Sequence, residues 1–337
     1  MTCSSPLPAS RRVLASSAGD CSFRPNRAQP KIATSITRPH WLLLGFENRL
    51  AARGIQQATV HDTKLAMYRT ADHGELRVAL DACPHRGASL SCGGAVKGEC
   101  VVCPYHSRSI GLNAYPERFF DYQVQDGLVW MDYASNLLTQ HHPPPAYPEH
   151  GDPSLRTFGY TKILRVNPVL MAENTLDWQH LSSVHRVHFI QGNPKVTIRS
   201  KGAHGWAEYA YASDIFDLTI DNEYHIPFTT SLRFRFRNRE TGEELPPLLL
   251  WFSITPLAEG TVALHLRVSR GALKSPLADW IFKLIDELPL LEDALVVAAV
   301  DPLEWSRNDL DAGDEFVAAY RAAMTEAFPE LLQWYVR

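Results

Sequence analysis

Residues 83–111 have the sequence CPHRGASLSCGGAVKGECVVCPYHSRSIG. One residue separates Cys83 from His85, and two residues separate Cys103 from His106. Thiolates and imidazoles at this density are typical ligands of zinc or of an iron-sulfur cluster. A zinc finger groups its two cysteines and its two histidines, whereas each short loop here offers one of each. The order therefore favours a [2Fe-2S] cluster in which two thiolates hold one iron and two imidazoles hold the other.

The composition is that of an ordinary soluble globular protein. The 337 residues are enough for two domains, with 45% hydrophobic residues, 21% charged residues and a formal net charge of -4. Nothing suggests nucleic-acid binding, and no stretch approaches the ~20 apolar residues of a membrane span. Four of the six cysteines lie between residues 83 and 103, which indicates metal binding in a reducing compartment. We expect the two that are not in the ligand pattern, Cys92 and Cys100, to be free thiols.

The first 39 residues differ from the rest of the chain. Residues 1–39 contain five arginines, one lysine and seven serines against a single acid, Asp20. This composition fits a transit peptide for a plastid or mitochondrion, or else a disordered extension. Without a targeting role for this segment, we expect a cytoplasmic protein.

The pattern of the remaining chain predicts two domains. Residues 40–135 contain short strand-like runs with turn residues between them, which predict a small all-β domain. Residues 136–155 contain the run QHHPPPAYPEHGDP, whose five prolines suit a linker. Residues 156–337 show alternating strands and then helical stretches over about 276–300 and 313–327, which predict a second domain with an antiparallel sheet. The fold class is α+β.

The loops CPHRGASLS and CPYH resemble the Rieske loops of ring-hydroxylating and related oxygenases. This resemblance implies that Cys83, His85, Cys103 and His106 hold a Rieske [2Fe-2S] cluster. The family pattern usually continues CPYHGW, whereas this chain continues with Ser107 and Arg108. A cation beside a ligand histidine would favour the reduced cluster and raise its potential.

A second motif follows the linker. The run ENTLDWQHLSSVH, residues 173–185, resembles the mononuclear-iron motif N-x-x-D-x-x-H-x4-H of Rieske non-haem iron oxygenases. Asn174, Asp177, His180 and His185 are in register with it, while His188 is not. We expect one helix from Pro168 through this motif. The two-residue gap between Asn and Asp resembles the vanillate and dicamba O-demethylase branch.

The motif implies that His180 and His185 bind Fe(II) together with a carboxylate from far along the chain. The segment LLEDALVVAAVDP is the nearest match to the family's third-ligand segment and nominates Asp293. The acids weighed for this role are Asp286, Glu287, Glu292, Asp293 and Asp301. In the family, the aspartate corresponding to Asp177 connects a cluster histidine of a neighbouring subunit to an iron-ligating histidine.

The resemblance implies a Rieske domain followed by a helix-grip catalytic domain, assembled as a homotrimer. It also implies a hydroxylase or oxidative demethylase that uses O2 on a small organic substrate, aromatic or polycyclic. The chain has no dinucleotide or flavin signature, so electrons from NAD(P)H must arrive through a separate reductase or ferredoxin. We expect pocket residues near Phe216 and Trp251, although both aromatics could equally belong to the core.

Three alternatives remain open at this stage. The first is an aromatic-ring cis-dihydroxylating dioxygenase. The second is a plastid monooxygenase of tetrapyrrole or other biosynthesis, which the composition of the N-terminal segment permits. The third belongs to another class: an electron-transfer Rieske protein without oxygenase activity.

Overall fold

The computed structural model of the chain describes residues 41–51, 54–133, 143–185, 193–212, 215–258, 260–307 and 310–335. The expectations for residues 1–39 and for His188 lie outside these ranges. The described chain divides into two compact units. One contains residues 47–120, and the other combines residues 41–46 with everything from residue 121 onward.

The first unit is all β apart from two short 3-10 turns, as its sequence predicts. It contains two three-stranded antiparallel sheets, in the orders β2-β3-β4 and β5-β6-β7. Buried Tyr68, Val101 and Ile110 form its core together with Cys83 and Cys103, so these two cysteines are anchored by packing. The strands are β2 (Ile55–Val60), β3 (Thr63–Arg69), β4 (Leu76–Leu80), β5 (Ala95–Lys97), β6 (Cys100–Val102) and β7 (Ser109–Ile110).

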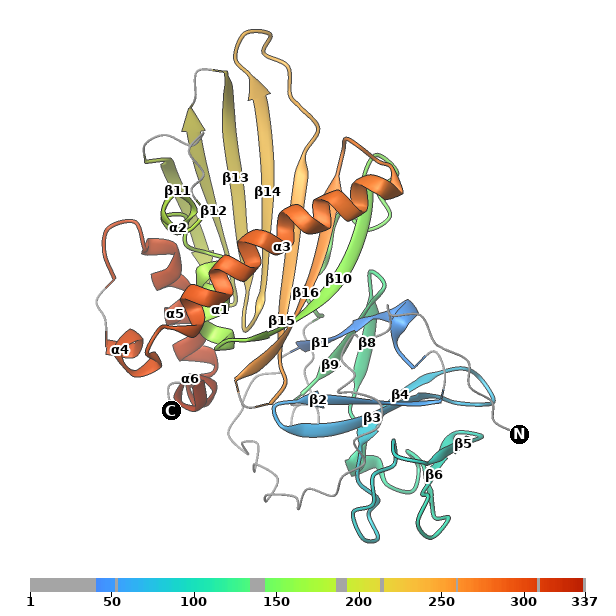
Figure 1. Cartoon of the computed structure of the whole chain (residues 1–337). Helices are drawn as coiled ribbons and strands as arrows, with labels where there is room; N and C mark the ends of the chain where they lie inside the picture. Colours follow the sequence, from blue (N-terminus) through green and yellow to red (C-terminus); the bar gives the residue numbers. More distant parts are fainter. Residues whose placement is uncertain are drawn as a thin grey trace. The chain divides into compact units, whose positions relative to one another are not determined.

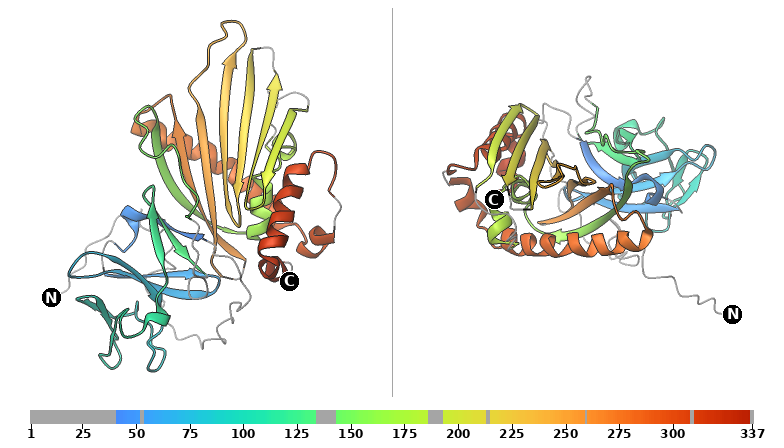
Figure 2. Two further views of the ribbon diagram at one scale, coloured as in Figure 1. Left: turned by 180° about the vertical axis from the view of Figure 1, so that it is seen from behind. Right: turned by 90° about the horizontal axis from the view of Figure 1, so that it is seen from above.

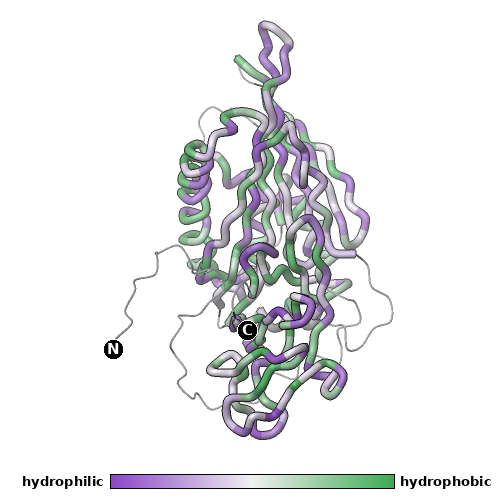
Figure 3. The backbone as a smooth tube through the Cα atoms, turned by 90° about the vertical axis from the view of Figure 1, so that its right-hand side faces the viewer, coloured by the Kyte–Doolittle hydropathy of each residue, from purple (hydrophilic) through white to green (hydrophobic). Residues whose placement is uncertain are grey.

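A seven-stranded antiparallel sheet dominates the second unit, in the order β10-β16-β15-β14-β13-β12-β11 (Figure 1). Its strands are β10 (Arg156–Arg165), β11 (Lys195–Lys201), β12 (His204–Ala212), β13 (Phe216–His225), β14 (Thr229–Asn238), β15 (Leu248–Pro256) and β16 (Thr261–Arg270). A smaller sheet joins β1 (Trp41–Phe46), β9 (Leu128–Asp132) and β8 (Tyr122–Gln125). Hydrophobic and hydrophilic residues alternate along many of these strands (Figure 3). The predicted α+β class is confirmed.

The long helix α3 (Pro276–Ala298) crosses one face of the large sheet (Figures 1 and 2). Ser275 caps its start by accepting a hydrogen bond from the backbone N–H of Ala278, and Pro276 occupies the first helical position. The side chains buried along α3 are Ala278, Asp286, Leu290, Asp293 and Val297. Two carboxylates on the inner face of a helix need a reason, because burying a charge without a partner is costly.

The opposite face of α3 is also apolar. Leu277, Leu288 and Leu295 are 70%, 66% and 75% exposed, and Ile281, Leu284 and Leu291 continue the same stripe. A helix that is hydrophobic all round is normally covered on all sides. The isolated chain therefore leaves an apolar surface uncovered.

The motif segment forms two short helices, so the single helix expected from Pro168 onward is wrong. The helix α1 (Pro168–Asn174) ends before Thr175, and α2 (His180–Ser183) begins five residues later. Side chains in the gap replace helical hydrogen bonds: the Thr175 hydroxyl donates to the Ala172 carbonyl, and an Asp177 oxygen accepts from the Gln179 N–H. Such local bonds compete with helix continuation.

The C-terminal helices are tied to α1 by a buried ion pair. These helices are α4 (Pro302–Arg307), α5 (Glu315–Ala327) and α6 (Pro329–Tyr335), of which only α5 is predicted from the sequence. The Arg321 guanidinium donates to both oxygens of Glu173, at 2.7 and 2.9 Å, and the Trp305 indole donates to the same carboxylate. Burial raises the pKa of Glu173 even though Arg321 and Trp305 oppose the rise.

Replacing Arg321 by methionine should destabilise the protein by about 3 kcal/mol, because Glu173 stays buried without its cation. Chemical denaturation measures the loss. Arg235→Met is the matched control: it removes the pairs that the exposed Arg235 makes with Asp221 and Glu208, and should cost less than about 1 kcal/mol. Equal losses in the two variants would contradict a structural role for the buried pair.

Candidate metal centres

Two loops of identical hydrogen-bond pattern carry the first set of ligand candidates. The Cys83 N–H donates to the Ala88 carbonyl, and the Gly87 N–H donates back to the Cys83 carbonyl. In the second loop, the Cys103 N–H donates to the Arg108 carbonyl, and the Ser107 N–H donates to the Cys103 carbonyl. Each loop therefore folds back on its own cysteine.

The equivalence of the two loops shows which backbone conformation Ser107 adopts where the family pattern has glycine. Gly87 and Ser107 hold the same place in their loops, and both have left-handed backbones, with φ of 73° and 53°. Glycine adopts this conformation without penalty, whereas other L-residues pay roughly 1–2 kcal/mol for it. Serine stands here at a position whose geometry favours glycine.

Replacing Ser107 by glycine should therefore raise the free energy of unfolding by about 0.5–1 kcal/mol, the relief of strain exceeding the added chain entropy. A shift in the denaturation midpoint of the cluster-loaded protein measures it. Ser109→Gly, on the extended strand β7, should instead lower stability. A loss of stability in Ser107→Gly would contradict the strain at this position.

The four side chains of these loops fit a cluster with two thiolates and two imidazoles. Cys83 and Cys103 are buried, and the ring centroids of His85 and His106 are 4.8 Å apart. Burial opposes ionisation of Cys103, but the N–H groups of Tyr105 and His106 that point at its sulfur lower its pKa overall. A sulfur that receives two backbone donors is suited to the thiolate form that binds iron.

The two remaining cysteines of this unit supply no further ligand. Cys100 is a free thiol, as expected. Cys92 is disulfide-bonded, so the expectation of a free thiol there is wrong.

The second set of candidates meets at one carboxylate oxygen. Asp293 Oδ1 lies 3.1 Å from His185 Nε2 and 3.6 Å from His180 Nε2. One ligand atom from each of the three residues lies within 4.8 Å of the other two. Asp293 Oδ1 has no hydrogen-bond partner although it is buried. Two imidazoles and a carboxylate that converge in this way fit a divalent iron ion.

The other nitrogen of each imidazole faces a second acid. His185 Nδ1 lies 3.0 Å from a Glu292 oxygen, and His180 Nδ1 lies 3.7 Å from an Asp177 oxygen. The nearby carboxylates of Asp293 and Glu292 raise the pKa of His185, against the effect of partial burial. Carboxylates in this position orient an imidazole and fix which nitrogen is free to bind a metal.

Of the five acids weighed as the third ligand, the structure brings only Asp293 into this cluster. Glu292 contacts the outer nitrogen of His185, and Asp301 caps α4 through the N–H groups of Leu303 and Glu304. Glu287 pairs with Lys162 and Lys283. Asp286 is buried, and its Oδ2 has no hydrogen-bond partner.

A cavity of about 240 Å³ opens beside the three converging residues. It lies between α3, the α1–α2 segment and the inner face of the large sheet. Most of its wall is apolar and comes from four strands: Leu218, Ile220, Phe234, Phe236, Phe252 and Leu266. An apolar cavity with a few polar groups is the usual form of a small-molecule site.

Trp251, which the sequence suggested for this pocket, faces away from it. Its neighbours Leu250 and Phe252 line the cavity, and alternate residues of a strand point to opposite faces. Trp251 instead packs with Trp130 and Tyr147 in a core cluster against β9. Phe216 packs edge-to-face with Phe236 and does not line the cavity wall.

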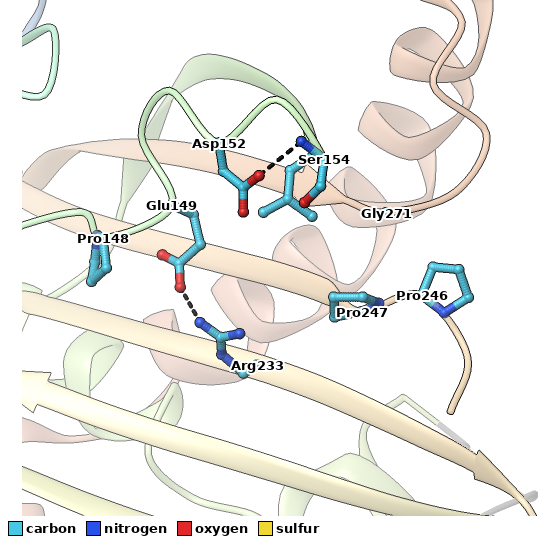
Figure 4. A pocket seen from close by; sticks show the side chains of 9 residues that line it. Pro148, Glu149, Asp152, Ser154, Arg233, Pro246, Pro247 and Gly271 are labelled. Atoms are coloured by element: carbon cyan, nitrogen blue, oxygen red, sulfur yellow. Dashed lines mark hydrogen bonds and ion pairs between the residues drawn. The ribbon is translucent and has the colours of Figure 1, made fainter. Parts of the chain in front are cut away.

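The larger hollow of the second unit, about 510 Å³, contains none of the converging residues (Figure 4). Arg233 lies in it and pairs with Glu149, and it follows Leu232 of the apolar cavity on the same strand, so it points to the other face of the sheet. A further cluster on that other face joins His204, Glu223 and His225, with partly exposed side chains.

Comparison with known proteins shows which proteins share these features. The model of the Rieske [2Fe-2S] domain matches residues 40–118. The chain is 31% identical over 172 residues to the oxygenase component of dicamba O-demethylase from Stenotrophomonas maltophilia, covering 46% of this chain and 49% of the relative. It is 26% identical over 206 residues to the cholesterol 7-desaturase nvd of Drosophila melanogaster, covering 54% and 48%. The chain thus spans about half the length of the curated relatives it matches.

The fold has a solved counterpart. The crystal structure of dicamba monooxygenase bound to dicamba superposes with a TM-score of 0.71 over 88% of this chain and 97% of that one, at 21% identity. Fold and ligand loops together define a two-part protein in which a Rieske [2Fe-2S] domain precedes a helix-grip domain. Residues 40–118 thus match a Rieske [2Fe-2S] domain, and the chain is similar in sequence and in fold to the oxygenase component of dicamba O-demethylase.

Proposed function

We propose that this chain is the terminal oxygenase of a multicomponent system that hydroxylates or oxidatively demethylates a small organic substrate. The observation that carries the proposal is the convergence of His180, His185 and Asp293 at the edge of an apolar cavity. These three residues would hold a mononuclear Fe(II), which leaves coordination positions open for dioxygen activation beside a substrate. Cys83, His85, Cys103 and His106 would hold the Rieske cluster that supplies electrons.

The chain's own side chains have distinct parts in this reaction. Glu292 orients His185, and Asp177 stands beside His180, so both imidazoles present Nε2 toward the Asp293 oxygen. The apolar strands of the cavity exclude water from the substrate. Hydroxylation takes one oxygen atom of O2 into the substrate and releases the other as water, consuming two electrons and two protons. A hydroxylated methyl ether then loses formaldehyde.

The electrons come from a partner. We infer NAD(P)H as the source, with a flavin reductase or ferredoxin that docks near the Rieske cluster, since the sequence has no dinucleotide or flavin signature of its own. Asp177 is proposed to connect His180 to a cluster histidine of a neighbouring subunit in a homotrimer. The uncovered apolar face of α3 supports an oligomer.

The cell compartment stays a proposal. No helix in the described part of the chain is long and apolar enough to cross a membrane. We propose a cytoplasmic location, with a plastid or mitochondrion as the alternative if residues 1–39 are a transit peptide.

Two tests separate this function from its alternatives. The purified chain should contain three irons and two acid-labile sulfides, whereas an electron-transfer Rieske protein would contain two irons. Substrate-dependent oxygen uptake with NAD(P)H, a ferredoxin reductase, and a panel of aromatic ethers, polycyclic compounds and tetrapyrroles then identifies the substrate. Formaldehyde or a single hydroxyl in the product supports a monooxygenase, and a cis-diol supports ring dihydroxylation.

Replacing His180 by alanine should remove the mononuclear iron and leave two irons per chain, because only two ligands remain. Elemental analysis and the visible spectrum of the cluster measure both centres. His204→Ala, in the other histidine cluster, is the matched control and should keep three irons. Three irons in His180→Ala would contradict the ligand assignment.

A further inference from the structure

Several residues that line the cavity beside the proposed iron site carry a buried polar atom without a hydrogen-bond partner. In the described chain they are Asn174 Nδ2, His180 Nδ1, Asn222 Oδ1, Asp286 Oδ2 and Asp293 Oδ1. A metal ion would account for Asp293. It would not account for Asp286, because that carboxylate is outside the metal-ligand cluster.

Asp286 lies on the same face of α3 as Asp293, seven residues earlier. Seven residues are close to two helical turns, so the two carboxylates are about 10 Å apart along the helix axis. Both line the one cavity. The cavity therefore has an anionic ligand of the proposed iron at one place and a second acid about 10 Å away.

No cation of the described chain pairs with Asp286. Lys283, one turn earlier on α3, lies 3.7 Å from Glu287, and its ammonium also stands 5.4 Å from the ring centre of Tyr160. The Tyr160 hydroxyl is buried and has no hydrogen-bond partner either. Burying a carboxylate without a partner costs several kcal/mol. A protein can retain such a carboxylate where a ligand supplies the missing partner.

We propose that Asp286 recognises the substrate, and that the cavity takes an apolar molecule with a hydrogen-bond donor, a protonated amine or a hydroxyl, at the end remote from the carbon that is oxidised. This inference rests on the proposed function, because the oxidised carbon is the one nearest the His180, His185 and Asp293 cluster. When Asp286 is ionised, an anionic group in the donor's place is disfavoured by repulsion between two buried negative charges.

The size of the cavity limits the molecule. At about 240 Å³, the cavity is somewhat smaller than the usual small-molecule site of about 300–1,000 Å³. One aromatic ring with a short side chain suits a cavity of this size. We therefore place the donor at the end of a chain of a few atoms on a single ring.

Three matched probes test the proposal: 3-(4-methoxyphenyl)propan-1-amine, 1-methoxy-4-propylbenzene and 3-(4-methoxyphenyl)propanoic acid. Titration calorimetry with the iron-loaded protein, without reductant, measures their dissociation constants. The amine should bind at least ten-fold more tightly than the other two. In Asp286→Asn this preference should disappear through weaker amine binding, while binding of 1-methoxy-4-propylbenzene stays unchanged.

Two further variants separate recognition from a general effect of charge. Glu287→Gln removes a negative charge from the neighbouring position, which does not line the cavity, and should keep the amine preference. Asp286→Glu keeps the carboxylate but extends it by one methylene, and should shift the preference to the shorter 2-(4-methoxyphenyl)ethylamine. Equal amine affinity in wild type and Asp286→Asn overturns the proposal, as does tighter binding of the acid.

Because these measurements involve no turnover, the two levels of inference fail separately. An amine preference that depends on Asp286 in a protein without substrate-dependent oxygen uptake would support the recognition site and overturn the proposed function. Substrate-dependent oxygen uptake that does not change in Asp286→Asn would support the proposed function and overturn the recognition site.

Discussion

Replacing Asp177 by asparagine is expected to reduce substrate-dependent oxygen uptake roughly 100-fold or more while both iron centres stay loaded. One Asp177 oxygen accepts from the Gln179 N–H at 2.7 Å, and an asparagine side chain can keep that bond. The other oxygen, which faces His180 Nδ1 at 3.7 Å, loses its charge. Reduced uptake with three irons per chain would therefore report on electron delivery and not on folding.

Asp152→Asn is the matched control for this experiment. Asp152 makes the same local turn, accepting from the Ser154 N–H, and does not line the apolar cavity. It should leave uptake unchanged. Retained uptake in Asp177→Asn would contradict the connecting role.

Mixed assemblies show whether the electrons cross between subunits. His106→Ala removes a proposed cluster ligand and leaves Asp177 intact. Coexpression of this variant with Asp177→Asn should restore part of the uptake, since one subunit then provides the cluster and its neighbour provides the path to the mononuclear iron. No restoration in verified mixed oligomers would indicate a path within one chain.

Replacing Asp286 by asparagine should stabilise the protein increasingly as the pH rises. Burial raises the pKa of Asp286 from 3.8 to about 7. The folded state thus holds this proton more tightly than the unfolded state, and the wild type loses stability as the pH rises from about 4 to about 7. About three pKa units correspond to roughly 4 kcal/mol. Asparagine carries no charge to bury and escapes this loss.

The expected difference between variant and wild type is below about 2 kcal/mol at pH 5 and about 4 kcal/mol at pH 8. Chemical denaturation of both proteins across this range measures it. The groups near Asp286 are the Tyr160 hydroxyl on β10 and Lys283 and Glu287 on α3, and none of them changes in the variant. Glu287→Gln controls for the loss of one negative charge. A difference that does not change with pH would contradict an unpaired buried carboxylate.

The sequence predicts a metal site most directly where the candidate ligands are adjacent in the chain. Cys83 with His85 and Cys103 with His106 are close enough that a short loop presents each pair together, and the order of ligands distinguishes a Rieske cluster from a zinc finger. Strand alternation likewise predicted the antiparallel sheet, because the period of two is written directly in the residues.

Local hydrogen bonds determined two features that the periodicity of the sequence could not predict. The break between Asn174 and His180 comes from the Thr175 and Asp177 side chains, which outcompete the helical pattern. A serine in the sequence does not indicate a left-handed backbone, so the conformation of Ser107 could not be predicted. The structure shows it, together with the same hydrogen bonds in the Gly87 loop.

Tertiary structure decided which acids face the cavity. The sequence from Asp286 to Asp293 offers four carboxylates on one helix, and each has the same intrinsic chemistry. Packing of α3 against the sheet turns Asp286 and Asp293 inward and leaves Glu287 to pair with lysines. The sequence by itself determined that two metal sites are expected and which residues could form them. Only the folded chain determined that Asp293 meets both histidines while Asp286 stands unpaired about 10 Å along the helix, because that depends on which face of α3 is buried.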